Sequence, residues 1–279
     1  MDASSRQSTA VARFRRLHED GCFVIPNPWD AGSAIFLENL GFEALATTSA
    51  GFAFSRGLPD DPSVLPRDVM LDHIAEIAGA TKLPVNGDFQ SAYADDPEQV
   101  ATNVGLCVLT GAAGLSIEDA TGLRDRPLYD EPIAIERVKA ARAAIDASGV
   151  PVVLTARCES FLVGAAEPER VALSRLAAFA EAGADCLFAP GVIEPAAIAR
   201  MVKEVAPKPV NVLVSTMNRT LTVAQLRDLG VRRISVGGAL ARVAWGAFMR
   251  AARSIAEDGS FASFGDAAPF DELNALFER

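Results

Sequence analysis

Histidine and cysteine are scarce in this chain of 279 amino acids. The only two histidines are His18 and His73, and both lie in segments with helical periodicity rather than at the end of an expected strand. This argues against a histidine-based catalytic triad and against a histidine-rich zinc site. The four cysteines show no CxxC or other metal-ligand spacing, so we expect them to be buried free thiols.

Long runs of one charge and long apolar runs are also missing. The net charge is -10, and no Lys/Arg run is long enough to follow a phosphate backbone, which argues against binding to nucleic acid. The N-terminal residues contain no apolar signal core, and the longest apolar stretch, "GLCVLTGAAGLSI", is too short and too glycine-rich to span a bilayer. We therefore expect a soluble cytoplasmic protein that contacts neither nucleic acid nor membrane.

A regular alternation of short apolar runs and amphipathic segments is present instead. Strands buried on both faces and joined by helices indicate a parallel sheet, and eight such units in a chain of this length are typical of a (β/α)8 barrel. An open doubly wound sheet is the alternative, but no GxGxxG motif follows the first strand and no P-loop motif occurs. The expected strands are residues 22–27, 44–51, 83–89, 114–119, 151–158, 186–191, 209–215 and 233–238.

The domain organisation follows from the absence of any linker-like or low-complexity stretch. We predict a single α/β domain, a (β/α)8 TIM-type barrel, over residues 1–279. Residues 1–21 are expected to form a leading helix, and residues 259–279 a C-terminal appendage.

Polar side chains stand at the ends of most expected strands, where (β/α)8 enzymes place their chemistry. Acidic groups that converge there repel one another unless a cation or protons intervene. Oxygen donors without histidine or thiolate favour Mg²⁺ or Mn²⁺ over Zn²⁺. Arg157 can hold a carboxylate through two parallel hydrogen bonds, so a metal and this arginine together suit a 2-oxo acid. The strand-end residues are Asn27, Asp30, Thr48, Ser49, Asn86, Asp88, Glu118, Asp119, Arg157, Glu159, Asn211 and Ser215.

Each of these residues also has a structural interpretation. Strand-end Asp and Asn commonly cap the following helix or form a turn. Glu118 and Asp119 could be such caps, and Arg157 and Glu159 could form a structural ion pair. The occurrence of polar groups at six strand ends favours a site over capping alone.

Several segments together resemble the isocitrate lyase and phosphoenolpyruvate mutase superfamily. The resemblance implies a (β/α)8 barrel whose last helix is often exchanged between subunits, giving homodimers or homotetramers. It also implies Mg²⁺-dependent making or breaking of a carbon-carbon or carbon-phosphorus bond beside a pyruvate-like enolate. The matching segments are "PNPWDAGSAIFLENLGFEALATTSAG" followed by "RGLPD", then "PVNGDFQSAY", "GAAGLSIEDATG", "VVLTARCESFLVG", "EAGADCLFAPG" and "PVNVLVS".

The resemblance also implies roles for residues at the matching positions. Asp60, Asp88 and Glu118 would hold the metal and its waters, and Asp60, Glu118 and Arg157 are the expected catalytic groups. Arg157 would also bind the substrate carboxylate, and the segment "TTSAG" would bind the oxygens of the oxo acid. The expected substrate-binding residues are Thr48, Ser49, Ala50, Asn86, Arg157 and Asn211.

The chain departs from the family pattern in three places. The KKCGH or KRCGH loop of isocitrate and methylisocitrate lyases is missing, which argues against those two activities. Phosphonomutases have a lysine and a longer loop where this chain has Ala120 and a short loop, which argues against mutase chemistry. Neutral Asn86 and Gln90 replace acidic residues of the family pattern, so we expect metal binding that depends on the ligand.

We therefore expect an Mg²⁺-dependent lyase, decarboxylase or hydrolase that acts on a small 2-oxo or 2-hydroxy carboxylate. The first alternative is a barrel that binds a 2-oxo acid without catalysis, which neutral Asn86 and Gln90 would suit. Phosphonomutase or phosphonopyruvate hydrolase activity is a second alternative. An unrelated aldolase is disfavoured because no lysine stands at a strand end to form a Schiff base.

Overall fold

A computed structural model describes residues 3–61, 63–216 and 221–278. Eight parallel strands form one sheet in the order β1-β8-β7-β6-β5-β4-β3-β2. The backbone N–H of Ala46 in β2 donates to the carbonyl of Pro26, directly after β1, at 3.1 Å, so the two ends of the sheet meet. The strands are β1 (Phe23–Ile25), β2 (Leu45–Ala46), β3 (Val85–Asp88), β4 (Gly114–Glu118), β5 (Val153–Arg157), β6 (Cys186–Phe188), β7 (Val210–Leu213) and β8 (Arg233–Ser235).

Helices alternate with the strands and surround them, which confirms the (β/α)8 barrel and excludes the open sheet. Two helices, α3 and α4, lie between β2 and β3. The helices are α1 (Ala3–Leu17), α2 (Ala31–Asn39), α3 (Ser49–Ser55), α4 (Arg67–Ala80), α5 (Pro97–Val108), α6 (Glu131–Ser148), α7 (Pro168–Glu181), α8 (Pro195–Val205), α9 (Val223–Asp228), α10 (Ala239–Asp258), the 3-10 helix η1 (Ala262–Asp266) and α11 (Phe270–Phe277).

The apolar interior matches the pattern of the sequence. All four cysteines are free thiols, as expected; Cys107, Cys158 and Cys186 are buried, but Cys22 is only partly buried, contrary to the expectation. No helix among the described residues is long and apolar enough to cross a membrane.

Helix α1, inside the predicted leading segment, covers the N-terminal end of the barrel. The ring of Phe14 lies edge-on to that of Phe23, the first residue of β1, with centroids 6.3 Å apart. His18, just after α1, contacts Phe23 in the same way at 5.1 Å. This end of the barrel is therefore closed by aromatic side chains, and the C-terminal ends of the strands are left for a site.

The N-terminal closure yields a prediction about Gly114, the first residue of β4. A Cβ atom at this position would lie 2.7 Å from Cε1 of Phe14 and 2.9 Å from the carbonyl oxygen of Val153. We expect Gly114→Ala to lower the free energy of unfolding by about 1–3 kcal/mol, because the well-packed core cannot yield. Urea unfolding will measure this change in the free energy of unfolding. Gly105→Ala is the matched control: a Cβ there meets nothing within 4 Å in α5, so this change should stabilise the protein by about 0.5–1 kcal/mol.

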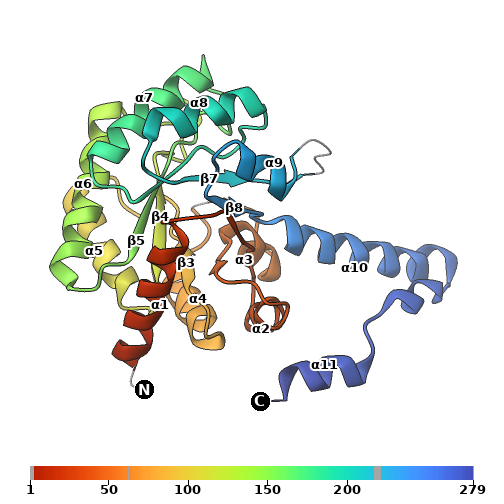
Figure 1. The fold of residues 1–279 in the computed structure, drawn as a ribbon. Helices are drawn as coiled ribbons and strands as arrows, with labels where there is room; N and C mark the ends of the chain where they lie inside the picture. Colours follow the sequence, from red (N-terminus) through yellow and green to blue (C-terminus); the bar gives the residue numbers. More distant parts are fainter. Residues whose placement is uncertain (1–2, 62, 217–220, 279) are drawn as a thin grey trace.

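The C-terminal arm, comprising α10, η1 and α11, leaves the barrel in Figure 1. It contains the predicted appendage at residues 259–279, which begins at Gly259, the left-handed C-cap of α10. The arm returns to the barrel near its end, where the ring of Phe277 lies 3.5 Å from the position a Cβ of Gly32 in α2 would take. Much of the arm's apolar surface is exposed, including Phe248 at 61% and Phe270 at 85%.

Candidate functional site

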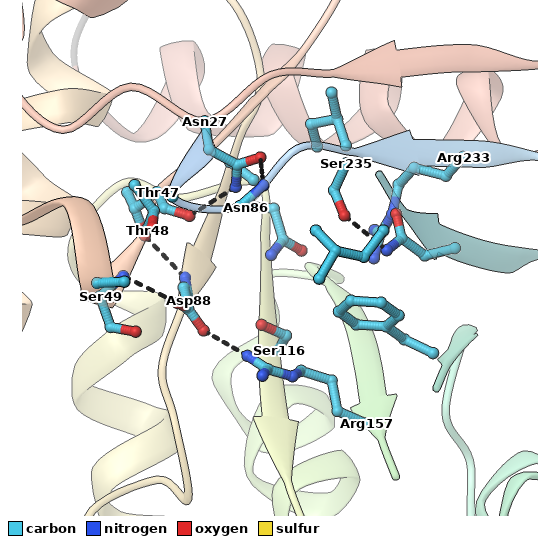
Figure 2. A pocket seen from close by; sticks show the side chains of 18 of the residues that line it. Asn27, Thr47, Thr48, Ser49, Asn86, Asp88, Ser116, Arg157, Arg233 and Ser235 are labelled. Carbon is cyan, nitrogen blue, oxygen red and sulfur yellow. Dashed lines mark hydrogen bonds and ion pairs between the residues drawn. The ribbon is translucent and has the colours of Figure 1, made fainter. Parts of the chain in front are cut away.

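A cavity of about 180 Å³ lies within the barrel toward the C-terminal ends of its strands (Figure 2). Most residues predicted for the site line it, although Glu118 does not. The predicted residues in the lining are Thr48, Ser49, Ala50, Asp60, Asn86, Asp88, Arg157 and Asn211.

Strand β3 delivers two polar groups to this cavity because side chains alternate along a strand. Asn86 and Asp88 line the cavity, whereas Gly87 faces α4, where a Cβ would lie 3.0 Å from Ile74. The Asn86 side chain donates to the Gly87 carbonyl at 3.3 Å, and its Oδ1 has no hydrogen-bond partner among the described residues. A ligand could therefore use this oxygen as an acceptor.

Asp88 is held by three short contacts from different elements. Its Oδ2 accepts from the backbone N–H of Ser49 at 2.9 Å, and its Oδ1 accepts from Nη1 of Arg157 at 2.8 Å. Its own N–H donates to Oγ1 of Thr47 at 2.8 Å. Figure 2 shows Asp88 between Ser49 and Arg157. The carboxylate is thus fixed in place before any ligand arrives.

Arg157, the last residue of β5, is shared by three carboxylates. Besides Asp88, its Nη2 lies 3.0 Å from Glu118 and 2.7 Å from Glu159. Burial disfavours the charged guanidinium, but Glu118, Glu159 and Asp88 outweigh it and raise the pKa of Arg157. The ring of Phe188 faces the guanidinium at 5.4 Å. The guanidinium of Arg157 is therefore paired with carboxylates at each of its terminal nitrogens. The ion pair with Glu159, which the sequence raised as a structural alternative, is present.

The carboxylates around Arg157 outnumber it. Burial, followed in size by the opposing effect of Arg157, raises the pKa of Glu118 to about 8. Burial and then the charge of Asp88 raise the pKa of Asp60, and burial raises that of Glu159. Four acids outnumber Arg157 even when Arg233, the second arginine of the cavity lining, is counted, so the site carries an excess of negative charge that either protons or a cation must offset.

Glu118 lies behind Arg157 rather than in the cavity. Together with Arg157 and Arg137 it borders a separate void of about 10 Å³. Asp60 belongs to the loop between α3 and α4 and does line the cavity. The three predicted metal ligands therefore do not all border the same cavity. No group of three or more His, Cys, Asp or Glu side chains in the described chain is arranged to hold a metal.

Other strand-end residues have structural roles. Asp30 is the N-cap of α2 and accepts from the N–H of Ser33 at 2.7 Å in a capping box. The side chain of Asn27 lines the cavity but also links strands, since its Oδ1 accepts from the N–H groups of Val236 and Gly237. Thr48 lines the cavity and also caps α3, accepting from Gly51 at 3.2 Å. Capping thus explains Asp30 and part of the role of Thr48.

Asp119 is structural as well. Its Oδ1 accepts from the N–H of Glu159, and its Oδ2 accepts from Nη1 of Arg175, each at 2.8 Å. Arg175 also donates to the carbonyl of Tyr129 at 2.7 Å. Asp119 therefore joins the segments after β4 and β5 to α7. It is buried and does not border the cavity.

The sequence interpretation missed several residues of the lining. The available signal was the period-two alternation, which places residues two before a strand-end group on the same face of the strand. Ser116 precedes Glu118 in this way, whereas Arg233 and Ser235 precede no residue of the predicted strand-end set. The missed residues that line the cavity include Thr47, Ser116, Leu162, Phe188, Arg233 and Ser235.

Gln90, predicted to mark a change in the acidic site, lies just beyond β3. Its backbone is in the left-handed region with φ 46°, and its carbonyl accepts from the N–H of Glu118 at 2.9 Å. Its buried Oε1 has no hydrogen-bond partner among the described residues, and the side chain does not line the cavity.

The fold and the site define a (β/α)8 barrel with an acidic, arginine-containing cavity at the C-terminal ends of its strands. The sequence profile of phosphoenolpyruvate phosphomutase matches residues 14–256. The chain belongs to this family, within the isocitrate lyase and phosphoenolpyruvate mutase superfamily of enzymes, and its named homologues include lyases and mutases.

Three individual proteins illustrate the relationship. A 2-methylisocitrate lyase of Salmonella typhimurium is 32% identical over 209 residues, which cover 72% of this chain and 69% of that protein. An uncharacterised protein of Mycobacterium tuberculosis is 31% identical over 265 residues, covering 94% of this chain and 95% of that one. The crystal structure of a candidate lyase/mutase from Burkholderia cenocepacia J2315 superposes with a TM-score of 0.94 at 46% identity, covering 99% of this chain and 98% of that one.

Proposed function

We propose that this protein is an Mg²⁺- or Mn²⁺-dependent enzyme that cleaves or forms a carbon-carbon or carbon-phosphorus bond next to a 2-oxo acid. The reaction would pass through a pyruvate-like enolate and be of lyase or decarboxylase type. The observation that carries this proposal is the cluster of Asp88, Glu118 and Glu159 around Arg157, with Asp88 open to the cavity. Membership of the superfamily supports the reaction class.

The donor set fits a divalent ion that prefers oxygen. Asp88 and Asp60 border the cavity, and Glu118 adds negative charge from behind Arg157. Because these groups form no closed cage, water and substrate oxygens would complete the coordination, as is usual for Mg²⁺. When bound, the ion would supply positive charge opposite the developing enolate oxygen. This arrangement agrees with the predicted dependence of metal binding on ligand.

The chain's own residues would bind and orient the acid. A substrate carboxylate can pair with Arg157 only in exchange for one of its present partners, and Asp88 is the one of these that borders the cavity. The N–H of Ser49, now donating to Asp88, would be freed for a substrate oxygen by the same exchange. Asp60 lines the cavity with a raised pKa, which suits a group that exchanges a proton with the substrate.

The test of the proposal is turnover. The protein would be incubated with Mg²⁺ and a panel of oxaloacetate, substituted malates and phosphonopyruvate, and products followed by NMR. Turnover of a carboxylic acid that depends on Mg²⁺ is expected. No turnover of any compound, together with no Mg²⁺-dependent binding of oxalate, would overturn the proposal.

Metal binding should also appear in thermal stability. We expect Mg²⁺ with oxalate to raise the melting temperature of the wild type, and Asp88→Asn to lose this shift. The shift should grow as pH rises toward and past the pKa of Glu118, about 8, because protonation of the cluster competes with the cation. Differential scanning fluorimetry at two pH values measures it. A shift of equal size in Asp88→Asn would contradict the role of this residue.

Neutral Asn86 and Gln90 favour one alternative, a barrel that binds a 2-oxo acid without catalysis. Both retain a buried side-chain oxygen without a partner in the described chain, where the family pattern has a carboxylate. Calorimetry that shows binding of pyruvate or 2-oxoglutarate, with turnover no faster than in an Asp88→Ala/Arg157→Ala control, would establish this alternative. Turnover of phosphonopyruvate alone would instead indicate mutase or hydrolase chemistry.

We also propose a homodimer or homotetramer in which the C-terminal arm is exchanged between subunits; a cytoplasmic location stays a prediction. The exposed aromatic residues of the arm support the exchange, since large exposed apolar surface marks an interface. They are Trp245, Phe248, Phe261, Phe264, Phe270 and Phe277. We expect Phe248→Asp to reduce the mass measured by light scattering during size-exclusion chromatography. Leu109→Asp, at a residue 81% exposed on the barrel, should leave the mass unchanged. A monomeric wild type would overturn the exchange.

A further inference from the structure

The inside of this barrel is unusually polar below its mouth. Layers of Val, Ile and Leu normally fill the interior of a (β/α)8 barrel. Here several inward positions carry hydroxyl, amide or guanidinium groups. These residues are Asn86, Ser116, Thr155, Asn211, Arg233 and Ser235, and all but Thr155 line the cavity.

Of these groups, Arg233 has the largest free-energy cost of burial, because it carries a charge. Only 3% of the residue is exposed. Its Nε donates to Oδ1 of Asn211 at 2.9 Å, and its Nη2 donates to Oγ1 of Thr155 at 3.0 Å. Its Nη1 lies 3.3 Å from Nε2 of His18. Asn211 and Thr155 are uncharged acceptors. His18 is one as well when its ring is neutral.

His18 does not supply a charge of its own. Burial and then the nearby Arg233 lower the pKa of His18 to about 3, so the ring is neutral at physiological pH. Its Nδ1 lies 2.7 Å from the Phe14 carbonyl, which suits a proton on Nδ1 and leaves Nε2 to accept from Arg233. The ring therefore serves Arg233 as a neutral acceptor.

The two arginines of the cavity differ in their counter-charges. Arg157 is paired with three carboxylates, whereas Arg233 forms no ion pair with any Asp or Glu of the described chain. A buried charge without a partner is strongly unfavourable, and such charges are normally paired. Burial also lowers the pKa of Arg233. An anion that enters the cavity would therefore find Arg233, not Arg157, without a competing acid.

We infer that Arg233 binds a second anionic group of the substrate, so that the enzyme selects dicarboxylates over monocarboxylates. Figure 2 shows Arg233 and Ser235 on one side of the cavity, and Asp88 with Arg157 on another. The 2-oxo end would lie near Asp88, and the distal carboxylate would pair with Arg233 beside the hydroxyl of Ser235. The inference rests on the proposed function for the 2-oxo end, but the anion site stands on its own contacts.

The volume of the cavity is suited to a small ligand. About 180 Å³ is less than the roughly 300–1,000 Å³ of pockets for drug-sized molecules. A short-chain dicarboxylate is of suitable size, and its two charged ends match two separate polar regions of the cavity.

The experiment compares acids that differ only at the distal end. Oxaloacetate is paired with 2-oxobutanoate, and malate with 2-hydroxybutanoate, so that a carboxylate replaces a methyl group. Dissociation constants are measured by calorimetry in the presence of Mg²⁺ for the wild type, Arg233→Met and Arg233→Lys. Arg232→Met is the matched control, because Arg232 bonds to the Gly21 carbonyl at 2.7 Å outside the cavity.

We expect the wild type to bind each dicarboxylate at least about tenfold more tightly than its partner, equivalent to about 1.4 kcal/mol. Arg233→Met should lose this preference, with little change in affinity for the monocarboxylates. Arg233→Lys should keep part of it, and Arg232→Met should keep all of it. Equal affinity of the wild type for the two members of each pair would overturn the inference, whatever the variants do.

Failure of the proposed function gives a different result. If no acid is turned over but sulfate or succinate raises the melting temperature of the wild type and not of Arg233→Met, the anion site stands and the enzymatic proposal falls. If turnover occurs while Arg233→Met retains the dicarboxylate preference, the enzymatic proposal stands and this inference falls. Circular dichroism confirms that each variant is folded, and an unfolded Arg233→Met leaves the decision to the wild-type preference and to Arg233→Lys.

Discussion

Replacing Arg157 with methionine should lower the free energy of unfolding by about 3–5 kcal/mol at neutral to alkaline pH and abolish turnover. The change removes the only cation that contacts Asp88, Glu118 and Glu159 in the described structure and leaves three close carboxylates uncompensated. The substrate carboxylate would also lose its proposed partner. Urea unfolding and the substrate panel measure the two effects.

The loss of stability should depend on pH with a definite sign. Without Arg157 the folded-state pKa values of Glu118 and Glu159 rise further above their unfolded values, so the folded state takes up protons more readily as pH falls. The deficit relative to the wild type should therefore be largest at alkaline pH and shrink as the solution is acidified. A deficit that grows on acidification would contradict this account of the cluster.

Arg157→Lys separates charge from geometry. It keeps one positive charge but cannot reach three carboxylates with a planar fork, so we expect it to retain most of the stability and to weaken binding of a 2-oxo acid by about 1–3 kcal/mol. Arg170→Met is the surface control, since Arg170 pairs with Glu167 where both side chains are about two-thirds exposed. That variant should unfold like the wild type, because exposed ion pairs contribute little.

Replacing Arg175 with methionine should also lower the free energy of unfolding by about 3–5 kcal/mol, because it leaves buried Asp119 without its cation. The side chains of this pair are only 8% and 2% exposed. Unlike Arg157, Arg175 does not border the cavity. The affinity of folded protein for ligand should therefore change much less than stability, and chemical unfolding together with calorimetry distinguishes the two.

A double variant tests the cause of the lower stability expected for Arg175→Met. Asp119→Asn/Arg175→Met removes both charges and should recover part of the loss, because the asparagine side-chain oxygen can still accept from the N–H of Glu159. If the double variant were less stable than Arg175→Met alone, the loss would come from packing of the long arginine side chain rather than from an unpaired carboxylate.

Alternation along single strands made part of the site predictable. The period-two alternation of a strand places Asn86 and Asp88 on one face of β3 and Gly87 on the other, and the cavity lining and Ile74 show this arrangement. Arg157, Thr48, Ser49 and Asn211 were likewise placed at strand ends from local patterns, and they line the cavity. Such patterns depend on neighbours two residues away, so a single segment contains them.

Partners between distant strands were less predictable. Nothing near "TAR" in the sequence shows that Arg157 meets Asp88, which lies 69 positions earlier. Glu118 was expected with Asp88 and Asp60 as a metal ligand; it pairs with Arg157 and does not line the cavity that those two residues border. Asp30 and Asp119 looked equivalent to Asp88 as strand-end acids, yet one caps a helix and the other pairs with Arg175. The sequence did not indicate Arg233 as a site residue, because the first residue of a strand is not a usual place for a binding group.

The sequence alone determined the (β/α)8 barrel, the family and the set of polar residues at the strand ends, because periodicity and burial are properties of short segments. Only the tertiary structure decided which charges meet. Within the described residues, closure of the sheet and the stagger of its strands bring three carboxylates to Arg157 and none to Arg233. The energy of a buried charge depends on its neighbours in space, and those neighbours come from strands far apart in the chain.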